Sequence, residues 1–144
     1  MSRTLVVGLG NEARGDDAAG LLAARAVRTL GLAGVDVEEH GDVAGLAEAI
    51  VRHSDVVLFD AVAGGTPGAV VEVELGGLRR VTTSSHGLDA SEAVDLARVL
   101  GSQARVRVIG IVGCCFETGA PPSADVRRAA DVAALRIKEV MQCA

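Results

Sequence analysis

The sequence has almost no aromatic residues: it contains neither Trp nor Tyr and only two Phe among 144 residues. Proteins that hold single-stranded nucleic acid stack bases on aromatic side chains, so this shortage argues against such a function. The core must therefore be built from aliphatic side chains, and hydrophobic residues supply 49% of the sequence. That fraction is typical of a globular domain and excludes disorder for most of the chain.

Basic residues are outnumbered, because 14 Lys and Arg stand against 19 Asp and Glu and give a formal net charge of -5. A protein that binds duplex DNA needs a basic surface, so we expect no nucleic-acid partner. Long apolar runs are also missing, and none approaches the roughly 18 residues that span a bilayer. The first residues lack the apolar region and cleavage site of a signal peptide. We therefore expect a cytoplasmic protein that does not associate with membranes.

Cysteine is scarce, with three residues and no C-x-x-C spacing. An odd number of cysteines without that spacing provides no disulfide framework, which agrees with a cytoplasmic location. Two of them, Cys114 and Cys115, follow a predicted strand. We expect both to be small buried hydrophobic residues.

Strand-like and helix-like segments alternate along the chain. The run at residues 55–60 is continuously apolar, as in a buried parallel strand, whereas 69–75 alternates, as in a half-exposed antiparallel strand at a sheet edge. One domain, residues 1–144, is therefore expected to have an α/β fold, a three-layer α/β/α sandwich around a mostly parallel sheet. Further strands are predicted at residues 4–8, 35–39, 80–83 and 106–111, and helices at 17–30, 42–50, 89–100 and 121–140.

A glycine-rich loop follows the first predicted strand, with Gly8 and Gly10 ahead of the acidic pair Asp16 and Asp17. The spacing is not that of a dinucleotide fingerprint, and carboxylates at a helix start would repel a pyrophosphate. The acidic pair instead favours a cation. A cap at Asp16, with Asp17 complementing the helix dipole, explains the same residues without any ligand.

Two more candidate residues stand where elements meet. Asp60 closes the apolar run 55–60, and His86 lies between Ser and Gly ahead of a predicted helix cap. Ligands of parallel α/β sheets bind outside the carboxyl ends of the strands, so Asp17, Asp60 and His86 are expected at one edge. Two carboxylates and an imidazole suit zinc, nickel or manganese and leave positions open for water or substrate. A turn or cap role for Asp60 is the alternative.

Taken together, these segments resemble the maturation endopeptidases of [NiFe] hydrogenases. The resemblance rests on the glycine-rich loop and acidic pair of residues 7–20, on Asp60 with its following alanine, and on S-S-H-G-L at 84–88. The three motifs occur in register over nearly the whole chain. Residues 111–117 depart from the acidic loop that members often carry after the last strand.

This resemblance implies a five-stranded twisted sheet in a single hydrogenase maturation protease-like domain, residues 1–144. It implies an endopeptidase that removes the C-terminal extension of a [NiFe] hydrogenase large-subunit precursor after nickel insertion, with the metal as its recognition mark. Asp17, Asp60 and His86 are then both the metal-binding and the catalytic residues of an aspartic or metal-dependent type of endopeptidase. Nickel is supplied by the precursor, no organic cofactor is expected, and the enzyme is expected to be a monomer.

Supporting roles are expected for two neighbours in the first loop. Asn11 would steady the loop, and Asp16 would cap the helix that carries Asp17. We expect the metal ligands to be exposed loop side chains whose replacement costs little stability. Two other functions fit the same residues: a nickel-sensing or metallochaperone-like module without peptidase activity, and a nucleotide-binding regulatory domain that uses Gly8 and Gly10.

Overall fold

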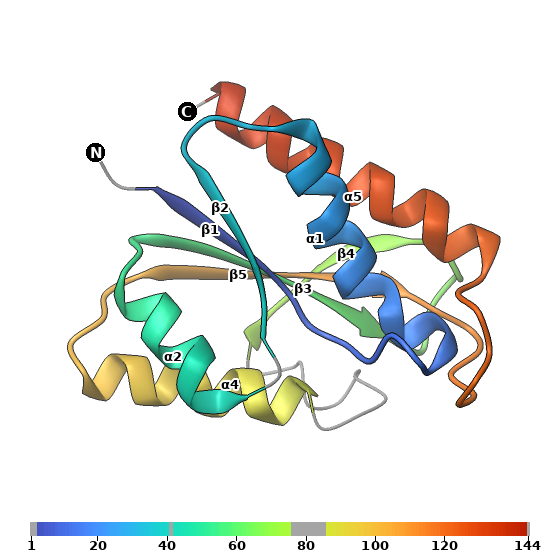
Figure 1. Ribbon diagram of the computed structural model, residues 1–144, viewed down its shortest axis with the longest axis horizontal. Helices are drawn as coiled ribbons and strands as arrows, with labels where there is room; N and C mark the ends of the chain where they lie inside the picture. The colour runs from blue at the N-terminus through green and yellow to red at the C-terminus, as the bar shows by residue number, and fades with distance from the viewer. Residues whose placement is uncertain (1–2, 41, 76–85, 144) are drawn as a thin grey trace.

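The computed structural model describes residues 3–40, 42–75 and 86–143, with the side chains of 86–89 and 142–143 left out. Within these residues, five strands form one sheet in the order β2-β1-β3-β5-β4 (Figure 1). Four of them run parallel, and the last pairs antiparallel with β5 at the edge, as predicted. The strands are β1 (Thr4–Gly8), β2 (Val35–Glu39), β3 (Asp55–Val62), β4 (Val70–Val73) and β5 (Arg105–Val112).

Helices cover both faces of the sheet, which confirms the predicted three-layer α/β/α sandwich (Figure 1). One face carries α1 (Ala19–Leu30) and α5 (Ala124–Cys143), and the other carries α2 (Val43–Val51) and α4 (His86–Val99). A short 3₁₀ helix, η1 (Gly15–Ala18), precedes α1. In the part of the chain described, no helix is both long and apolar enough to cross a membrane. The strand predicted at 80–83 lies outside the described residues.

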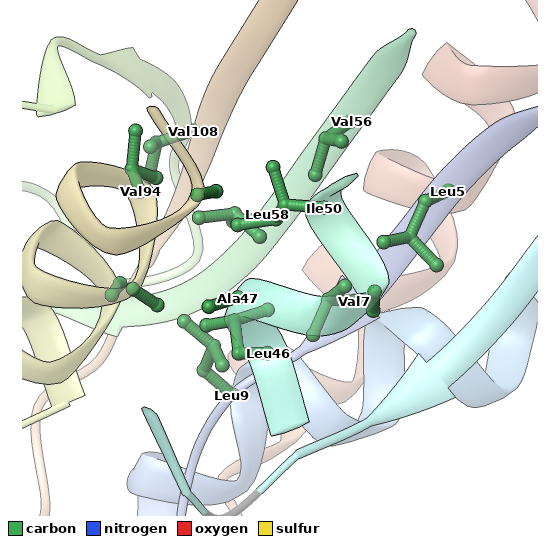
Figure 2. Packing of buried hydrophobic residues seen from close by; sticks show 14 of the residues in the cluster. Leu5, Val7, Leu9, Leu46, Ala47, Ile50, Val56, Leu58, Val94 and Val108 are labelled. Carbon is green, nitrogen blue, oxygen red and sulfur yellow. The ribbon is translucent and has the colours of Figure 1, made fainter. Parts of the chain in front are cut away.

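The alternation of side chains along the strands divides the core into two clusters. Leu58 and its neighbours face α2 and α4 (Figure 2), whereas Phe59 and its neighbours face α1 and α5. Burial on both faces explains why β3 is apolar almost throughout. Complete burial of one such side chain contributes about 1.5–3 kcal/mol, so both helix layers are firmly held on the sheet.

Local chemistry sets most helix ends but not all of them. The carboxylate of Asp42 caps α2 by accepting the N–H of Gly45 at 2.8 Å, as predicted. Helix α4 instead begins at His86, three residues before the capping box predicted at Asp89. The predicted loop position of His86 was therefore wrong: a local capping preference alone does not decide where a helix begins.

The order of the strands creates a topological switch point between β1 and β3. The chain leaves β1 toward β2 on one side and returns to β3 on the other, and parallel sheets bind ligands at such a switch point. β1 ends at Gly8, opposite Phe59, whereas β3 continues to Val62 because its last residues still pair with β5. The prediction that Asp60 ends its strand was therefore wrong. Asp60 is instead the first residue of β3 beyond the end of β1.

The start of α1 packs closely on the strand ends at this switch point. A Cβ atom on Gly20 would overlap the carbonyl oxygens of Leu9 and Phe59, and one on Gly8 would lie 2.7 Å from the Gly20 carbonyl oxygen. Real Cβ atoms do not approach backbone so closely. Glycine at these two positions therefore allows η1 and α1 to reach the carboxyl ends of β1 and β3.

We predict that Gly20→Ala lowers the free energy of unfolding by about 1–3 kcal/mol, although alanine is the better helix former. The added methyl group meets rigid backbone, so the helix must shift. Gly65→Ala is the matched control, because its methyl group would meet only Val112 side-chain atoms, the nearest at 3.3 Å. That control should change stability by less than about 0.5 kcal/mol. Urea denaturation of both variants measures the difference, and equal stability would contradict the close approach.

Candidate functional site

The elements that contain the three predicted ligands place these positions toward the carboxyl edge of the sheet. Asp17 lies in η1, which packs against β3, the strand that contains Asp60. His86 is the first residue of α4, and the end of that helix leads into the amino end of β5. The start of α4 therefore lies toward the opposite, carboxyl edge, where the other two residues are found.

Strand alternation turns Asp60 toward the face covered by α2 and α4. Leu58 and Val62, which share its side of β3, both belong to the cluster packed by these helices. The Asp60 side chain is fully buried, and its Oδ1 accepts the N–H of Ala61 at 2.8 Å. Asp60 therefore lies on the same side of the sheet as His86, whose side chain is outside the described part of the structure.

Asp17 is buried as deeply as Asp60, with 1% of its surface exposed. Its backbone carbonyl accepts the N–H of Asn11 at 3.2 Å, and its own N–H donates to the carbonyl of Arg14 at 3.1 Å. The guanidinium of Arg14 lies 3.8 Å from the Asp17 carboxylate. The expectation that the ligands are exposed loop side chains was wrong for both aspartates: Asp60 lies inside the buried strand β3, and the tight approach at Gly20 holds η1, with Asp17, against the strand ends.

Asp16 does not cap the helix that follows it, contrary to the prediction. The chain enters η1 through Gly15 at a φ of 57°, so Asp16 already lies inside the 3₁₀ helix, and no side chain caps its start. The buried carboxylate of Asp16 turns instead to the loop after β5 and to the start of α5. It accepts the N–H groups of Cys114 at 2.9 Å, Cys115 at 3.3 Å and Ser123 at 2.7 Å, and the Ser123 hydroxyl at 3.1 Å.

These hydrogen bonds set the ionisation of the groups around Asp16. Burial raises the pKa of Asp16, but the N–H groups of Cys114, Ser123 and Cys115 and the Ser123 hydroxyl outweigh it, so the pKa lies below its usual value. Desolvation and the negative charge of Asp16 raise the pKa of the Cys114 thiol. Asp16 is therefore ionised at neutral pH, and Cys114 is protonated.

The prediction that both cysteines are buried was wrong. Cys114 is exposed and Cys115 is half-buried. Both follow the last residue of β5 at the carboxyl edge of the sheet, where the chain turns outward instead of continuing into the core. The two thiols therefore belong to the surface around the candidate site.

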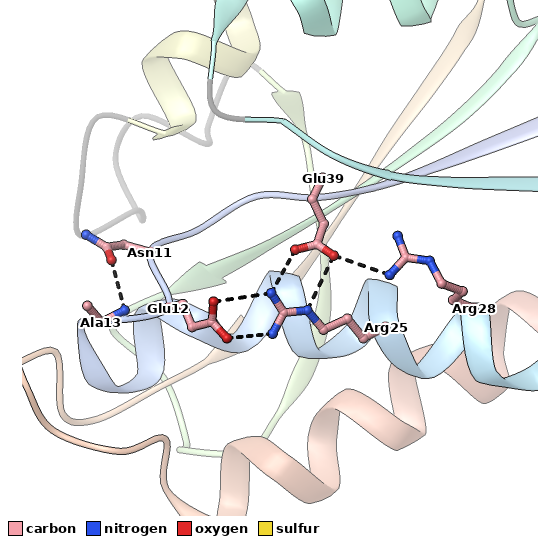
Figure 3. Close-up of polar contacts among 6 residues, drawn as sticks. All are labelled: Asn11, Glu12, Ala13, Arg25, Arg28 and Glu39. Atoms are coloured by element: carbon pink, nitrogen blue, oxygen red, sulfur yellow. Dashed lines mark hydrogen bonds and ion pairs between the residues drawn. The ribbon is translucent and has the colours of Figure 1, made fainter.

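A network of ion pairs holds the outer part of the first loop (Figure 3). Arg25 of α1 contacts Glu12 in this loop and Glu39 at the carboxyl end of β2, each at 2.9 Å. Asn11 Oδ1 accepts the N–H of Ala13 at 2.9 Å, which confirms its predicted role in steadying the loop. Sequence reasoning missed Arg25, because pairs 13 and 14 residues apart leave no local pattern to recognise.

The N–H groups of the first loop are largely engaged within the protein. The N–H of Ala13 binds a side chain of the same loop, and the N–H of Asp17 binds a carbonyl within it. Gly15 donates to the carbonyl of Ala120 at 3.0 Å, and Asp16 donates to that of Cys115 at 2.7 Å. A pyrophosphate needs several uncommitted N–H groups at a helix start, so this loop does not favour the nucleotide-binding alternative.

A complete metal site is not visible in the described residues: no three His, Cys, Asp or Glu side chains among them gather as ligands of one ion. Two of the three predicted ligands, Asp17 and Asp60, are buried on elements that pack against each other, η1 and β3, and the third contributes only its backbone position. The assignment of all three as ligands therefore stays a prediction.

Comparison with solved structures shows the same fold over nearly the whole chain. The [NiFe] hydrogenase maturation protease HybD from Thermococcus kodakarensis is 26% identical over 96% of this chain and 98% of its own, with a TM-score of 0.79. HycI from Thermococcus kodakarensis KOD1 is 23% identical over 98% of this chain and 93% of its own, with a TM-score of 0.77.

The hydrogenase maturating endopeptidase HybD from E. coli, at 19% identity, covers 97% of this chain and 92% of its own with a TM-score of 0.78. No protein-family model and no curated protein matches the chain. The chain therefore resembles the [NiFe] hydrogenase maturation proteases in fold and extent, and the resemblance predicted from its sequence is confirmed.

The hydrogen bonds of Asp16 predict a pH-dependent contribution to stability. Asp16→Asn should lower the free energy of unfolding at pH 7 by about 1–3 kcal/mol. The NH₂ group of the asparagine would face an N–H group and could not accept a hydrogen bond from it. The pKa of Asp16 lies below its usual value in the folded protein, so its contribution is present at neutral pH. It is lost as pH falls from about 4, where an unfolded Asp protonates, through the lower folded pKa.

Urea denaturation of wild type and Asp16→Asn at pH 7 and at pH 3 measures this difference. The gap between the two proteins should be smaller at pH 3. A gap that stays constant or widens in acid would show that the ionised carboxylate is not what stabilises the fold.

Proposed function

We propose that this protein is an endopeptidase that removes the C-terminal extension of a [NiFe] hydrogenase large-subunit precursor after nickel insertion. The observation that carries the proposal is the burial of Asp17 and Asp60 on two elements that pack together, η1 and β3, toward the edge where α4 begins with His86. The fold in which they meet is shared with HybD from Thermococcus kodakarensis, a [NiFe] hydrogenase maturation protease.

Asp17, Asp60 and His86 are the residues that would bind the nickel ion of the precursor. Two carboxylates and an imidazole are ligands that divalent nickel accepts, and three protein ligands leave positions for groups of the substrate. Nickel belongs to the substrate in this proposal, and no organic cofactor takes part. When bound there, nickel supplies a Lewis acid for the scissile carbonyl or an activated water.

Burial of the two carboxylates supports a cation at this place. A buried carboxylate is costly unless hydrogen bonds or a positive charge compensate it. In the free protein the partly exposed Arg14 supplies positive charge 3.8 Å from Asp17, while Asp60 accepts the Ala61 N–H. A divalent ion held between the two aspartates would add positive charge that offsets their desolvation.

The proposal extends to the type of enzyme, its partner and its location. The enzyme is of the aspartic or metal-dependent type, its partner is the nickel-loaded precursor, and it acts as a cytoplasmic monomer. A nickel-sensing or metallochaperone-like module would use the same three residues without cutting a peptide bond. Cleavage of a nickel-loaded precursor by the purified protein therefore separates the two functions.

Asp17→Asn and Asp60→Asn should each lose processing of the nickel-loaded precursor while the protein stays folded. The amide keeps the shape of the side chain but loses the charge that holds a cation. At Asp60, the amide oxygen still accepts the Ala61 N–H. His86→Ala should lose processing in the same way, and gel analysis of precursor cleavage with circular dichroism of each variant measures both effects.

Asp42→Asn is the matched control, since Asp42 is a carboxylate that caps α2 outside the site and Asn serves equally well as a cap. It should keep full activity. Full activity of Asp17→Asn and Asp60→Asn would remove these carboxylates from the mechanism. Loss of the folded signal in all three site variants would show that the residues are structural.

The protein without its precursor should bind Ni²⁺ only weakly, because three ligands form an open site and Arg14 already lies beside Asp17. Arg14→Ala should tighten Ni²⁺ binding by up to about fivefold, as expected for removal of a partly exposed ion pair that competes with the metal. Isothermal titration with Ni²⁺ and Zn²⁺ measures both. A tight stoichiometric metal that resists chelators would indicate a permanent metal centre instead.

A further inference from the structure

We infer that Asp16 is a positioning residue, which fixes the turn carrying Asp17 by binding the loop after β5 and the start of α5. The inference about placement comes from the hydrogen bonds of Asp16 alone. Its consequence for catalysis rests on the proposed function. The carboxylate of Asp16 is turned toward Cys114, Cys115 and Ser123. It would therefore act through Asp17 and not on the substrate.

The contacts of Asp16 fix its position with unusual completeness. Three of its four donors are backbone N–H groups, so their places are set by the course of the chain and not by side-chain rotation. The fourth donor, the Ser123 hydroxyl, also accepts the N–H of Val126 and so caps α5. One carboxylate therefore links the first loop to two other segments of the fold.

Backbone hydrogen bonds in both directions accompany the carboxylate. Asp16 N–H donates to the carbonyl of Cys115 at 2.7 Å, and Gly119 N–H donates to that of Ala13 at 2.7 Å. There is no free space between the segments, because a Cβ atom on Gly113 would lie 2.6 Å from Asp16 Cβ. The turn before Asp17 and the loop after β5 are therefore tied to each other at several points.

Only a carboxylate satisfies this arrangement. All four groups that face Asp16 are donors, and an ionised carboxylate offers acceptors on both oxygens. An asparagine has one accepting oxygen, so its NH₂ group must face at least one N–H whichever way it is turned. The change would therefore push the segments apart and displace the next residue, Asp17.

Steady-state cleavage of the nickel-loaded precursor by wild type, Asp16→Asn and Ser123→Ala tests the inference. Asp16→Asn should lower kcat by about 10–100-fold, the usual range for groups that orient a metal ligand, with KM for the precursor within about twofold. Ser123→Ala is the control, since it weakens the α5 cap but leaves three N–H groups on Asp16. Its kcat should stay within about twofold of wild type.

Amide hydrogen exchange gives a second readout that does not depend on activity. The N–H groups of Asn11 and Asp17 report the placement of Asp17, because both take part in hydrogen bonds of its backbone. They should lose protection in Asp16→Asn and keep it in Ser123→Ala. If wild type does not cleave the precursor, the proposed function fails, while the exchange data alone still decide the positioning role.

Three results would overturn the inference. The first is full kcat in Asp16→Asn. The second is unchanged protection of Asn11 and Asp17 in that variant. The third is an equal loss of kcat in Ser123→Ala, which would assign the effect to the α5 cap and not to the carboxylate.

Discussion

The close approach of η1 and α1 to the ends of β1 and β3 is the constraint on which the rest of this structure depends. It requires glycine at positions 8 and 20, where any side chain would meet backbone atoms. Because the helix start packs directly on the ends of these two strands, Asp17 is buried beside β3 although it belongs to a connecting segment. Backbone packing, more than side-chain choice, therefore brings two segments that are distant in sequence, η1 and β3, into contact.

Much of the fold could be predicted from the sequence, because period and composition are local signals. The apolar run of β3, the alternation of β4 and the cap at Asp42 each predicted the observed element. The errors arose where distant contacts decide. α4 begins three residues ahead of its predicted cap, and β3 continues past Asp60 because β5 pairs beside it.

The candidate site was likewise predictable only where a local pattern or a topological rule applies. The topological rule for parallel sheets was enough to bring Asp17 and Asp60 to one edge. The role of Asp16 was not predictable, because its partners lie about one hundred residues away and donate through backbone groups that any residue possesses. The ion pairs of Arg25 escaped prediction for a similar reason, since Glu12 and Glu39 flank it from different elements.

The thiol of Cys114 is exposed at the carboxyl edge of the sheet, and its raised pKa lowers its reactivity. Oxidants and electrophiles attack the thiolate, and a thiol whose pKa is raised has little thiolate at neutral pH. The same carboxylate that joins two loops thus lowers the susceptibility of its neighbour to sulfenic acid formation. Desolvation of the sulfur and the charge of Asp16 together raise the pKa of this thiol and so keep it in its less reactive, protonated form.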